Sequence, residues 1–285
     1  MRSLALLANL DSGSGGAEQV EGKLRELGAN VTAFDVRECE AAAGSGAERL
    51  VVAGGDGSIG YAAAAASEAG IPIAVVATGT ANDFAAEAGL PADLEEACRL
   101  AVQGDERRPL ELARAGPRPY VNVASLGLSP AAAERAHGLK ARIGALAYPV
   151  GALRAGAEVH PLSCVVSCEG SLLYEGEAWQ VSVASSGAFG GGSSLETDDS
   201  DGKLDLVVIE GSGRGRLVKH AYGLRMGGVE EQKGVLSRRC SSVDLELDES
   251  ECLNVDGELI EAGELAEDGS IHFAVTDDAF ELIVG

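Results

Sequence analysis

An apolar strand-like run, a turn and a helix-like stretch recur in this order through the first third of the chain. The strand-like runs are residues 4–10, 30–36, 49–55 and 71–78, and the helix-like segments are residues 16–28, 58–70 and 90–105, the last opened by Pro91. Repeated β–α–β order predicts a largely parallel sheet with helices on both faces. We therefore expect an α/β domain over residues 1–110. The C-terminal segment of about residues 276–285 is a candidate for a further part of this domain.

The pattern changes near residue 108. From there the chain consists mostly of alternating strands separated by Gly, Asp and Ser turns, with a helical stretch over residues 139–156. A length of 285 residues is sufficient for two hydrophobic cores. We expect residues 111–275 to form a second domain, a mainly antiparallel β-sandwich.

The charge of the chain excludes one class of partner. Acidic residues outnumber basic ones by 45 to 22, which gives a formal net charge of −23, and only five of the basic residues are Lys. Because nucleic-acid binding depends on Lys and Arg neutralising phosphates, we expect no nucleic-acid partner. The acidic excess is typical of halophilic proteins, in which concentrated salt screens the self-repulsion.

Two further features bear on the compartment. No apolar stretch reaches the roughly 18 residues that a membrane helix needs, and the amino terminus resembles a strand more than a signal peptide. The six cysteines form no C-x-x-C pair and have no matching His cluster; they are Cys39, Cys98, Cys164, Cys168, Cys240 and Cys252. We expect a cytoplasmic protein with reduced thiols.

A glycine-rich joint, Gly54-Gly55-Asp56-Gly57, connects a strand to a helix that we expect to begin at Ser58. Backbone N–H groups free of side chains at a helix amino terminus form an anion site. The same residues are also an ordinary tight-turn signal. No G-x-x-x-x-G-K-[ST] pattern is present, so a phosphate would need its compensating charge from another element.

Glycine and polar residues also follow two other strands of the predicted sheet. They are Gly79, Thr80, Asn82 and Asp83 after the strand at 71–78, and Asn9, Ser12 and Gly13 after the first strand. Thr80, Asn82 and Asp83 are equally suited to cap the next helix. Three polar loops at the carboxyl edge of one parallel sheet nevertheless predict a nucleotide site.

The pair "GGDGS" and "GTANDFA" resembles the diacylglycerol kinase catalytic family, which includes bacterial and archaeal lipid kinases and sphingosine kinase relatives. Further matching stretches follow in order: "YVNVASLGL" (120–128), "LKARIGALAYPVGALRA" (139–155), "GAFGGG" (187–192), "DSDGKLDLVVI" (199–209) and "LNVDGEL" (253–259). The resemblance implies an α/β domain of the NAD kinase and phosphofructokinase type that binds ATP, and a β-rich domain for the acceptor. It implies ATP- and Mg²⁺-dependent transfer of the γ-phosphate to a lipid hydroxyl.

The resemblance also assigns roles to single residues. It implies that Glu258 is the catalytic base and that Asp56 lies beside the nucleotide phosphates, directly or through Mg²⁺. From the residues alone, "NVDGEL" is equally a hairpin whose turn is Asp256-Gly257 and whose flank is Glu258.

A structural metal site is the third implication. Asp201 matches the family's metal-binding carboxylate, with the backbone carbonyls of Asp198 and Lys203 completing the site. The alternative is a solvated acidic loop, which is common in so acidic a chain.

Five positions depart from the family pattern: Leu10, Gly60, Ala77, Ala86 and the region around Phe34, where no adenine-side Thr is found. The Asn and Arg that the family has at positions 60 and 86 are nucleotide-side donors. The open alternatives to a lipid kinase are therefore a NAD kinase and a nucleotide-binding regulatory protein without kinase activity.

The partners expected on this reading are a lipid substrate, with transient contact to the inner membrane surface, and a second copy of the chain in a homodimer. The lipid is diacylglycerol-like, a sphingoid base or an archaeal ether lipid, and the sequence does not distinguish among them.

Overall fold

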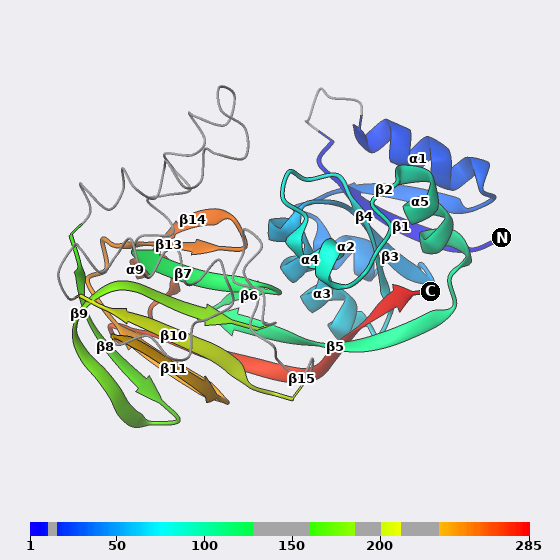
Figure 1. Cartoon of the computed structure of the whole chain (residues 1–285). Coiled ribbons are helices and arrows are strands. Elements are labelled where there is room, and N and C mark those ends of the chain that lie inside the picture. Colours follow the sequence, from blue (N-terminus) through cyan, green and yellow to red (C-terminus); the bar gives the residue numbers. More distant parts are fainter. Residues whose placement is uncertain (11–15, 128–159, 186–200, 212–233) are drawn as a thin grey trace. The chain divides into compact units, whose positions relative to one another are not determined.

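The computed structural model of this protein describes residues 1–10, 16–127, 160–185, 201–211 and 234–285. The chain divides into two compact units, which Figure 1 shows coloured along the sequence. The first comprises Met1–Leu112, Pro119–Val121 and Thr276–Gly285, and the second comprises Ala113–Arg118 and Asn122–Val275. The C-terminal segment thus belongs to the same unit as the N-terminal third.

The first unit is built on a parallel sheet with the strand order β15-β4-β3-β1-β2. Its strands are β1 (Ser3–Ala8), β2 (Asn30–Asp35), β3 (Arg49–Gly54), β4 (Ile73–Ala77) and the end of β15 (Ser270–Val284). The four expected strand runs therefore pair as parallel neighbours, which confirms the α/β class.

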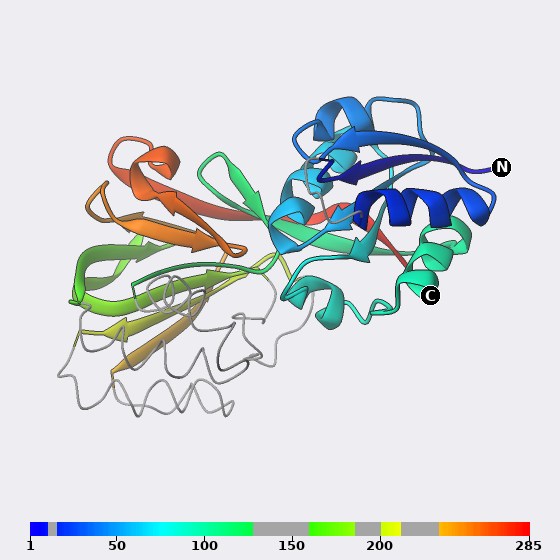
Figure 2. The same ribbon diagram turned by 90° about the horizontal axis from the view of Figure 1, so that it is seen from above.

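Helices cover both faces of this sheet because successive strand residues point to opposite sides. They are α1 (Gly16–Glu26), α2 (Cys39–Ala43), α3 (Asp56–Ala69), α4 (Asp83–Glu87) and α5 (Leu94–Gln103). On one face Leu7 and Val52 pack with Ile59 of α3, and on the other Leu6 packs in one cluster with Leu24 of α1. Figure 2 shows α1 and α5 side by side on their face.

The ends of α3 and α5 follow from identifiable residues. Helix α3 closes at Gly70, which is left-handed with φ 67°. Helix α5 begins after Asp93, whose carboxylate accepts the N–H groups of Glu95 and Glu96, so the expectation that Pro91 opens this helix is wrong. A side chain that satisfies two orphan donors fixes the start more firmly than a proline does.

The second unit is the expected mainly antiparallel β-sandwich. Its elements, of which β5 and β6 belong to both units, are β5 (Glu106–Ala115), β6 (Arg118–Tyr120), β7 (Val123–Gly127), β8 (Leu162–Cys168), β9 (Ser171–Ala184), β10 (Leu204–Glu210), β11 (Val235–Cys240), β12 (Ser242–Glu246), β13 (Cys252–Val255), β14 (Glu258–Glu261) and the short helix α9 (Ala262–Leu265). The long strand β9 pairs β8 with its first half and both β7 and β10 with its second half. The helix expected over residues 139–156 lies outside the described residues.

Two of the six cysteines depart from the expectation of reduced thiols. Cys168, at the end of β8, forms a disulfide with Cys240, at the end of β11, and their Cα atoms are 5.8 Å apart. The two residues are 72 positions apart in the sequence, so their proximity arises only from strand pairing. Cys39, Cys98, Cys164 and Cys252 are not part of this disulfide.

Within the ranges that the structure describes, no helix is both long and apolar enough to cross a membrane.

Candidate functional site

The first glycine joint places a helix amino terminus at the end of a buried strand. Strand β3 stops at Gly54, and α3 begins at Asp56, two residues earlier than expected. Gly55 is the N-cap residue and has no side chain to satisfy the orphan N–H groups of the first turn. The Ser58 hydroxyl donates to the Gly55 carbonyl oxygen at 2.7 Å instead of capping the helix. The loop therefore presents backbone donors and the positive end of the helix dipole to an anion.

The second glycine joint lies in contact with the first. A Cβ atom on Gly79 would lie 2.5 Å from the Cα atom of Gly55, so residue 79 has to be glycine for the two loops to approach this closely. The Thr78 N–H donates to the Gly54 carbonyl oxygen at 3.0 Å. The structure thus brings together the loops after β3 and β4, as expected from their place on neighbouring parallel strands.

Asp56 joins these two loops with its side chain. Its Oδ2 atom accepts the Asp83 N–H at 3.2 Å, and its Oδ1 atom accepts the Phe84 N–H at 2.9 Å. Asp56 is only 9% exposed, and it caps α4 from the neighbouring loop. The two bonds use half of the acceptor sites of an ionised carboxylate, so the other half can face a phosphate-bound cation.

Asp56, and not the N-cap residue of α4, therefore supplies the cap of this helix. Asn82 is the N-cap residue but is left-handed, with φ 56°, and makes no capping bond. Its Nδ2 atom donates to the Gly79 carbonyl oxygen at 3.0 Å, whereas its Oδ1 atom is buried without a hydrogen-bond partner. Thr80 is exposed beside it. A buried acceptor without a donor marks a place where a ligand or water would bind.

The remaining residues predicted for the nucleotide lie at the first loop. Asn9 is exposed just after the end of β1. Ser12 and Gly13 lie outside the described residues.

Two of the departures from the family pattern differ in their surroundings. A Cβ atom on Gly60 would lie 2.7 Å from the Pro119 carbonyl oxygen and 3.1 Å from the Tyr120 Cα atom, so this chain has no room for the family's Asn. Ala86, in contrast, is exposed on α4. Packing therefore excludes an Asn side chain at position 60, but it does not exclude an Arg side chain at position 86.

In the second unit, the D-G-E stretch is a hairpin. Strands β13 and β14 pair with Val255 opposite Glu258, and the turn residues Asp256 and Gly257 have φ values of 47° and 90°. Positive φ at both positions is characteristic of a type I′ turn. Asn254 Oδ1 accepts the Gly257 N–H at 2.8 Å and closes the turn. The hairpin expected from the residues alone is thus present.

Glu258 nevertheless does not behave as an unpaired flanking residue. Its Oε2 atom lies 2.6 Å from Nη2 of Arg118, in an ion pair whose side chains are 58% and 13% exposed, respectively. Asp256 ties the same segments together, because its Oδ1 atom accepts the N–H groups of Asn122 at 3.0 Å and Val123 at 3.1 Å. Sequence reasoning missed Arg118 and the bonds of Asp256. Arg118 lies 140 positions from Glu258, so no local pattern could identify it.

The predicted metal ligands are only partly described. Asp201 forms an ion pair of 2.8 Å with Arg239, whose Nε atom is 3.4 Å from the buried carboxylate of Asp205. Burial raises the pKa of Asp205, and Arg239 opposes this shift. Lys203 lies two residues after Asp201 in the chain, and Asp198 lies outside the described residues. Among the described residues no group of three acidic, His or Cys side chains could hold a metal ion, so this site remains a prediction.

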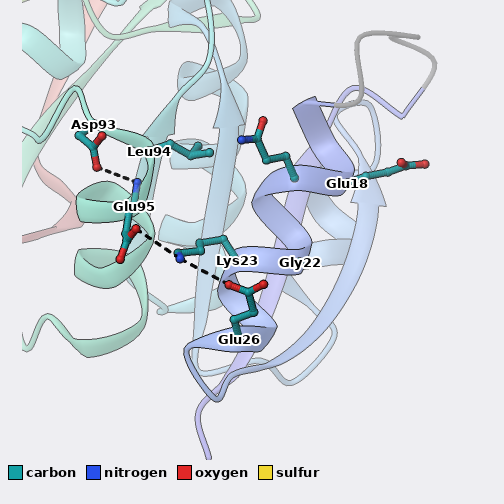
Figure 3. Close-up of a pocket in the computed structure, with 8 residues that line it drawn as sticks. Glu18, Gly22, Lys23, Glu26, Asp93, Leu94 and Glu95 are labelled. Carbon is teal, nitrogen blue, oxygen red and sulfur yellow. Dashed lines mark hydrogen bonds and ion pairs between the residues drawn. The ribbon is translucent and has the colours of Figure 1, made fainter.

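A surface pocket of about 500 Å³ lies between α1 and α5, and Figure 3 shows its lining. Lys23 lies 3.4 Å from each of the carboxylates of Glu26 and Glu95. The lining also includes Glu18 and Asp93 but none of the predicted site residues. Four carboxylates against one cation disfavour a polyphosphate there, so the glycine loops remain the candidate nucleotide site.

Two family models match the chain in order. Residues 3–115 match the diacylglycerol kinase catalytic domain, and residues 122–272 match the YegS C-terminal NAD kinase beta sandwich-like domain. A probable lipid kinase YegS-like from Pseudomonas aeruginosa PAO1 is 30% identical over 250 residues, which cover 85% of this chain and 81% of that protein.

Solved structures share the fold. A putative diacylglycerol kinase from Bacillus anthracis has a TM-score of 0.75 at 20% identity, covering all of this chain and 97% of that one. An NAD kinase from Archaeoglobus fulgidus in complex with ATP has a TM-score of 0.54 at 14% identity, covering all of this chain and 94% of that one.

Proposed function

Because this chain belongs to the lipid kinase family that combines a diacylglycerol kinase catalytic domain with a YegS C-terminal domain, we propose that it transfers the γ-phosphate of ATP to a hydroxyl group of a lipid. It is a phosphotransferase with an alcohol group as acceptor. The use of ATP and Mg²⁺ and the choice of a lipid as acceptor belong to the proposal.

The single observation that supports ATP binding is the pair of hydrogen bonds by which the Asp56 carboxylate joins the two glycine loops. It fixes the amino terminus of α3 against the loop after β4, with Oδ1 of Asn82 buried and unpartnered beside it. A rigid set of backbone donors at a helix terminus suits a chain of phosphates. The structurally similar NAD kinase, which was solved with ATP, supports this choice of ligand.

Glu258 supplies the acceptor chemistry in this proposal. Its carboxylate takes the proton from the lipid hydroxyl, the hydroxyl oxygen forms a bond to the γ-phosphorus, and the bond to the β–γ bridging oxygen breaks to release ADP. Asp56 would hold a Mg²⁺ ion bound with the nucleotide, and the ion would neutralise phosphate charge.

The proposal includes transient contact with a membrane surface, where the lipid resides. A net charge of −23 repels anionic headgroups at low ionic strength, and concentrated salt screens this repulsion. We therefore propose that the contact with the inner membrane face depends on salt and that the protein is otherwise cytoplasmic.

The test is transfer of radiolabelled phosphate from ATP in molar KCl with Mg²⁺, using a lipid extract, 1,2-dioleoylglycerol and NAD as separate acceptors. We expect labelled lipid that is strongly reduced, but still measurable, in Glu258→Gln and persists in Glu264→Gln, which changes an exposed glutamate on α9. Label on NAD alone would contradict the lipid proposal, and no transfer by a folded protein would contradict the kinase proposal.

A further inference from the structure

We infer that Arg118 positions the carboxylate of Glu258 for phosphoryl transfer, and that Asp256 fixes the backbone on which this pair is built. The inference rests on the proposed function, because the role of Glu258 as base is itself part of that proposal. Nothing in the sequence motifs assigns a role to Arg118.

Glu258 needs a charged partner such as Arg118, because few neighbouring groups restrict the rotamers of its exposed side chain. The Glu258 side chain is 58% exposed, and the residue is the first of strand β14, directly after the turn. An exposed glutamate samples many rotamers, and a base that samples many rotamers is rarely within hydrogen-bonding distance of the acceptor hydroxyl. A fixed cation next to the carboxylate removes most of that freedom.

Arg118 is suited to this task because its own side chain is only 13% exposed and its backbone is anchored. It follows the turn at Gly116, whose N–H donates to the His272 carbonyl oxygen at 2.8 Å. Gly116 has φ 55°, and a Cβ atom there would lie 2.1 Å from the Leu265 carbonyl oxygen, so the turn is packed tightly against its neighbours. A guanidinium also keeps its charge at every relevant pH and binds carboxylates directionally.

The backbone segments that carry the two charges are joined a second time. Asp256, two residues before Glu258, bonds the N–H groups of Asn122 and Val123, which follow Arg118 closely in the chain. The Asp256 N–H returns a bond of 3.1 Å to the Val123 carbonyl oxygen. Two hydrogen bonds to the Asp256 side chain, one backbone hydrogen bond and one ion pair therefore fix the spacing between the β6–β7 segment and the hairpin.

This arrangement distinguishes the two oxygens of the base. Oε2 of Glu258 bonds Arg118, so we assign Oε1 to the proton of the acceptor hydroxyl. The Asp and the Glu of the D-G-E stretch then have separate tasks, one in the backbone and one in the chemistry.

The test compares Arg118→Gln and Arg118→Lys with Arg114→Gln as the matched control. Arg114 lies in the same β5–β6 hairpin, and its Nη1 atom donates to the Pro117 carbonyl oxygen at 3.4 Å. We expect Arg118→Gln to lower kcat by about 100-fold with the KM for ATP nearly unchanged, because base catalysis contributes 10²–10⁴-fold. Arg118→Lys should recover part of the loss, and Arg114→Gln should resemble the wild type.

A double-mutant cycle separates positioning from general damage. In a Glu258→Gln background, Arg118→Gln should cause no further loss, since the group that it positions is already absent. Multiplicative losses, or equal effects of the changes at Arg114 and Arg118, would overturn the inference. Thermal unfolding of every variant checks that each one is folded.

A second measurement does not depend on turnover. In ¹H–¹⁵N spectra of guanidinium groups, the Arg118 signal, identified by its loss in Arg118→Lys, should shift in Glu258→Gln but not in Glu264→Gln. If no acceptor is phosphorylated, the proposed function fails while this spectrum still reports on the pair. An unshifted Arg118 signal would show that the pair is absent in solution and would overturn the inference.

Discussion

Asp56 Oδ1 accepts the backbone N–H of Phe84 at 2.9 Å, although the two residues are 28 positions apart. The bond crosses from the loop after β3 to the first turn of α4, so one carboxylate stabilises a helix and joins two loops. Removing it should therefore affect both the stability of the protein and the proposed binding of ATP.

We expect Asp56→Ala to lower the free energy of unfolding by about 1–2 kcal/mol, the usual cost of a lost helix cap, and to weaken ATP binding at least tenfold. Asp93→Ala is the matched control, because Asp93 caps α5 with two similar bonds of 2.9 and 3.0 Å but is not in either glycine loop. Urea unfolding and calorimetric titration with ATP measure the two effects. Equal ATP affinities in the two variants would contradict this role of Asp56.

Restoring the family's residues should have opposite outcomes at two positions. Gly60→Asn should destabilise the protein by about 1–3 kcal/mol, the cost of overpacking, because a Cβ atom there meets the Pro119 carbonyl oxygen at 2.7 Å. Ala86→Arg lies on an exposed position and should change stability by less than about 0.5 kcal/mol.

The same Ala86→Arg variant should bind ATP several-fold more tightly, since it adds a cation to the helix that Asp56 caps. Ala86→Gln, similar in polarity but uncharged, should not. The two affinities, measured at several KCl concentrations, decide the point: equal affinities would show that this position lies away from the phosphates.

Arg49 should be a strong determinant of stability although it has no part in the chemistry. Its guanidinium is buried and donates to the carbonyl oxygens of Ala101 at 2.8 Å and Gly104 at 3.0 Å, at the end of α5. Burial lowers the pKa of Arg49 to about 10. Arg49→Met should cost about 2–3 kcal/mol, because buried carbonyls lose charged donors.

The control for Arg49 is Arg99→Gln. Arg99 pairs with Glu95 one turn away on the surface of α5, and such pairs contribute only about 0.3–0.5 kcal/mol. Chemical unfolding of both variants at neutral pH provides the comparison. A loss at Arg49 as small as that at Arg99 would contradict the structural account.

Asp205 should make the stability of the protein depend on pH in an unusual direction. Burial raises the pKa of its carboxyl above the ordinary value of 3.8, with Arg239 opposing the shift. A carboxyl with a raised folded-state pKa favours folding below its unfolded pKa, and that contribution is lost as the pH rises through the folded-state pKa.

Asp205→Asn does not titrate, so its stability relative to the wild type should rise with pH through this window and level off above it. Urea unfolding of both proteins across the acid range, at constant KCl, gives the difference. A difference that falls with rising pH would show that Arg239 outweighs burial.

Much of the first unit follows from local sequence. The alternation of apolar runs with helical periodicity identifies β1, β2, β3 and β4, and both glycine joints lie where parallel strands end. The short helices α2 and α9, each about one turn, have too little periodicity to be recognised. Helix α5 begins later than the sequence pattern predicts, because Asp93 caps it.

What the sequence could not provide are the contacts between distant residues. The pairing of Arg118 with Glu258, the disulfide of Cys168 with Cys240 and the hydrogen bonds by which Asp56 joins the two glycine loops each depend on strand order and register. No local pattern contains them. For the same reason, local sequence does not show that the Pro119 carbonyl oxygen occupies the space that a side chain at Gly60 would need.

Strand β15 also constrains the order in which the polypeptide can acquire its structure. Its first residues pair with β12, whereas Leu282 pairs with Ile73 of β4, and Phe280, Leu282 and Ile283 are at most 3% exposed. The ribosome therefore has to synthesise every residue of the second unit before the core of the first can close. Until then the first unit of the nascent chain lacks the strand that pairs with β4 and leaves apolar surface exposed, the condition under which partly folded chains aggregate.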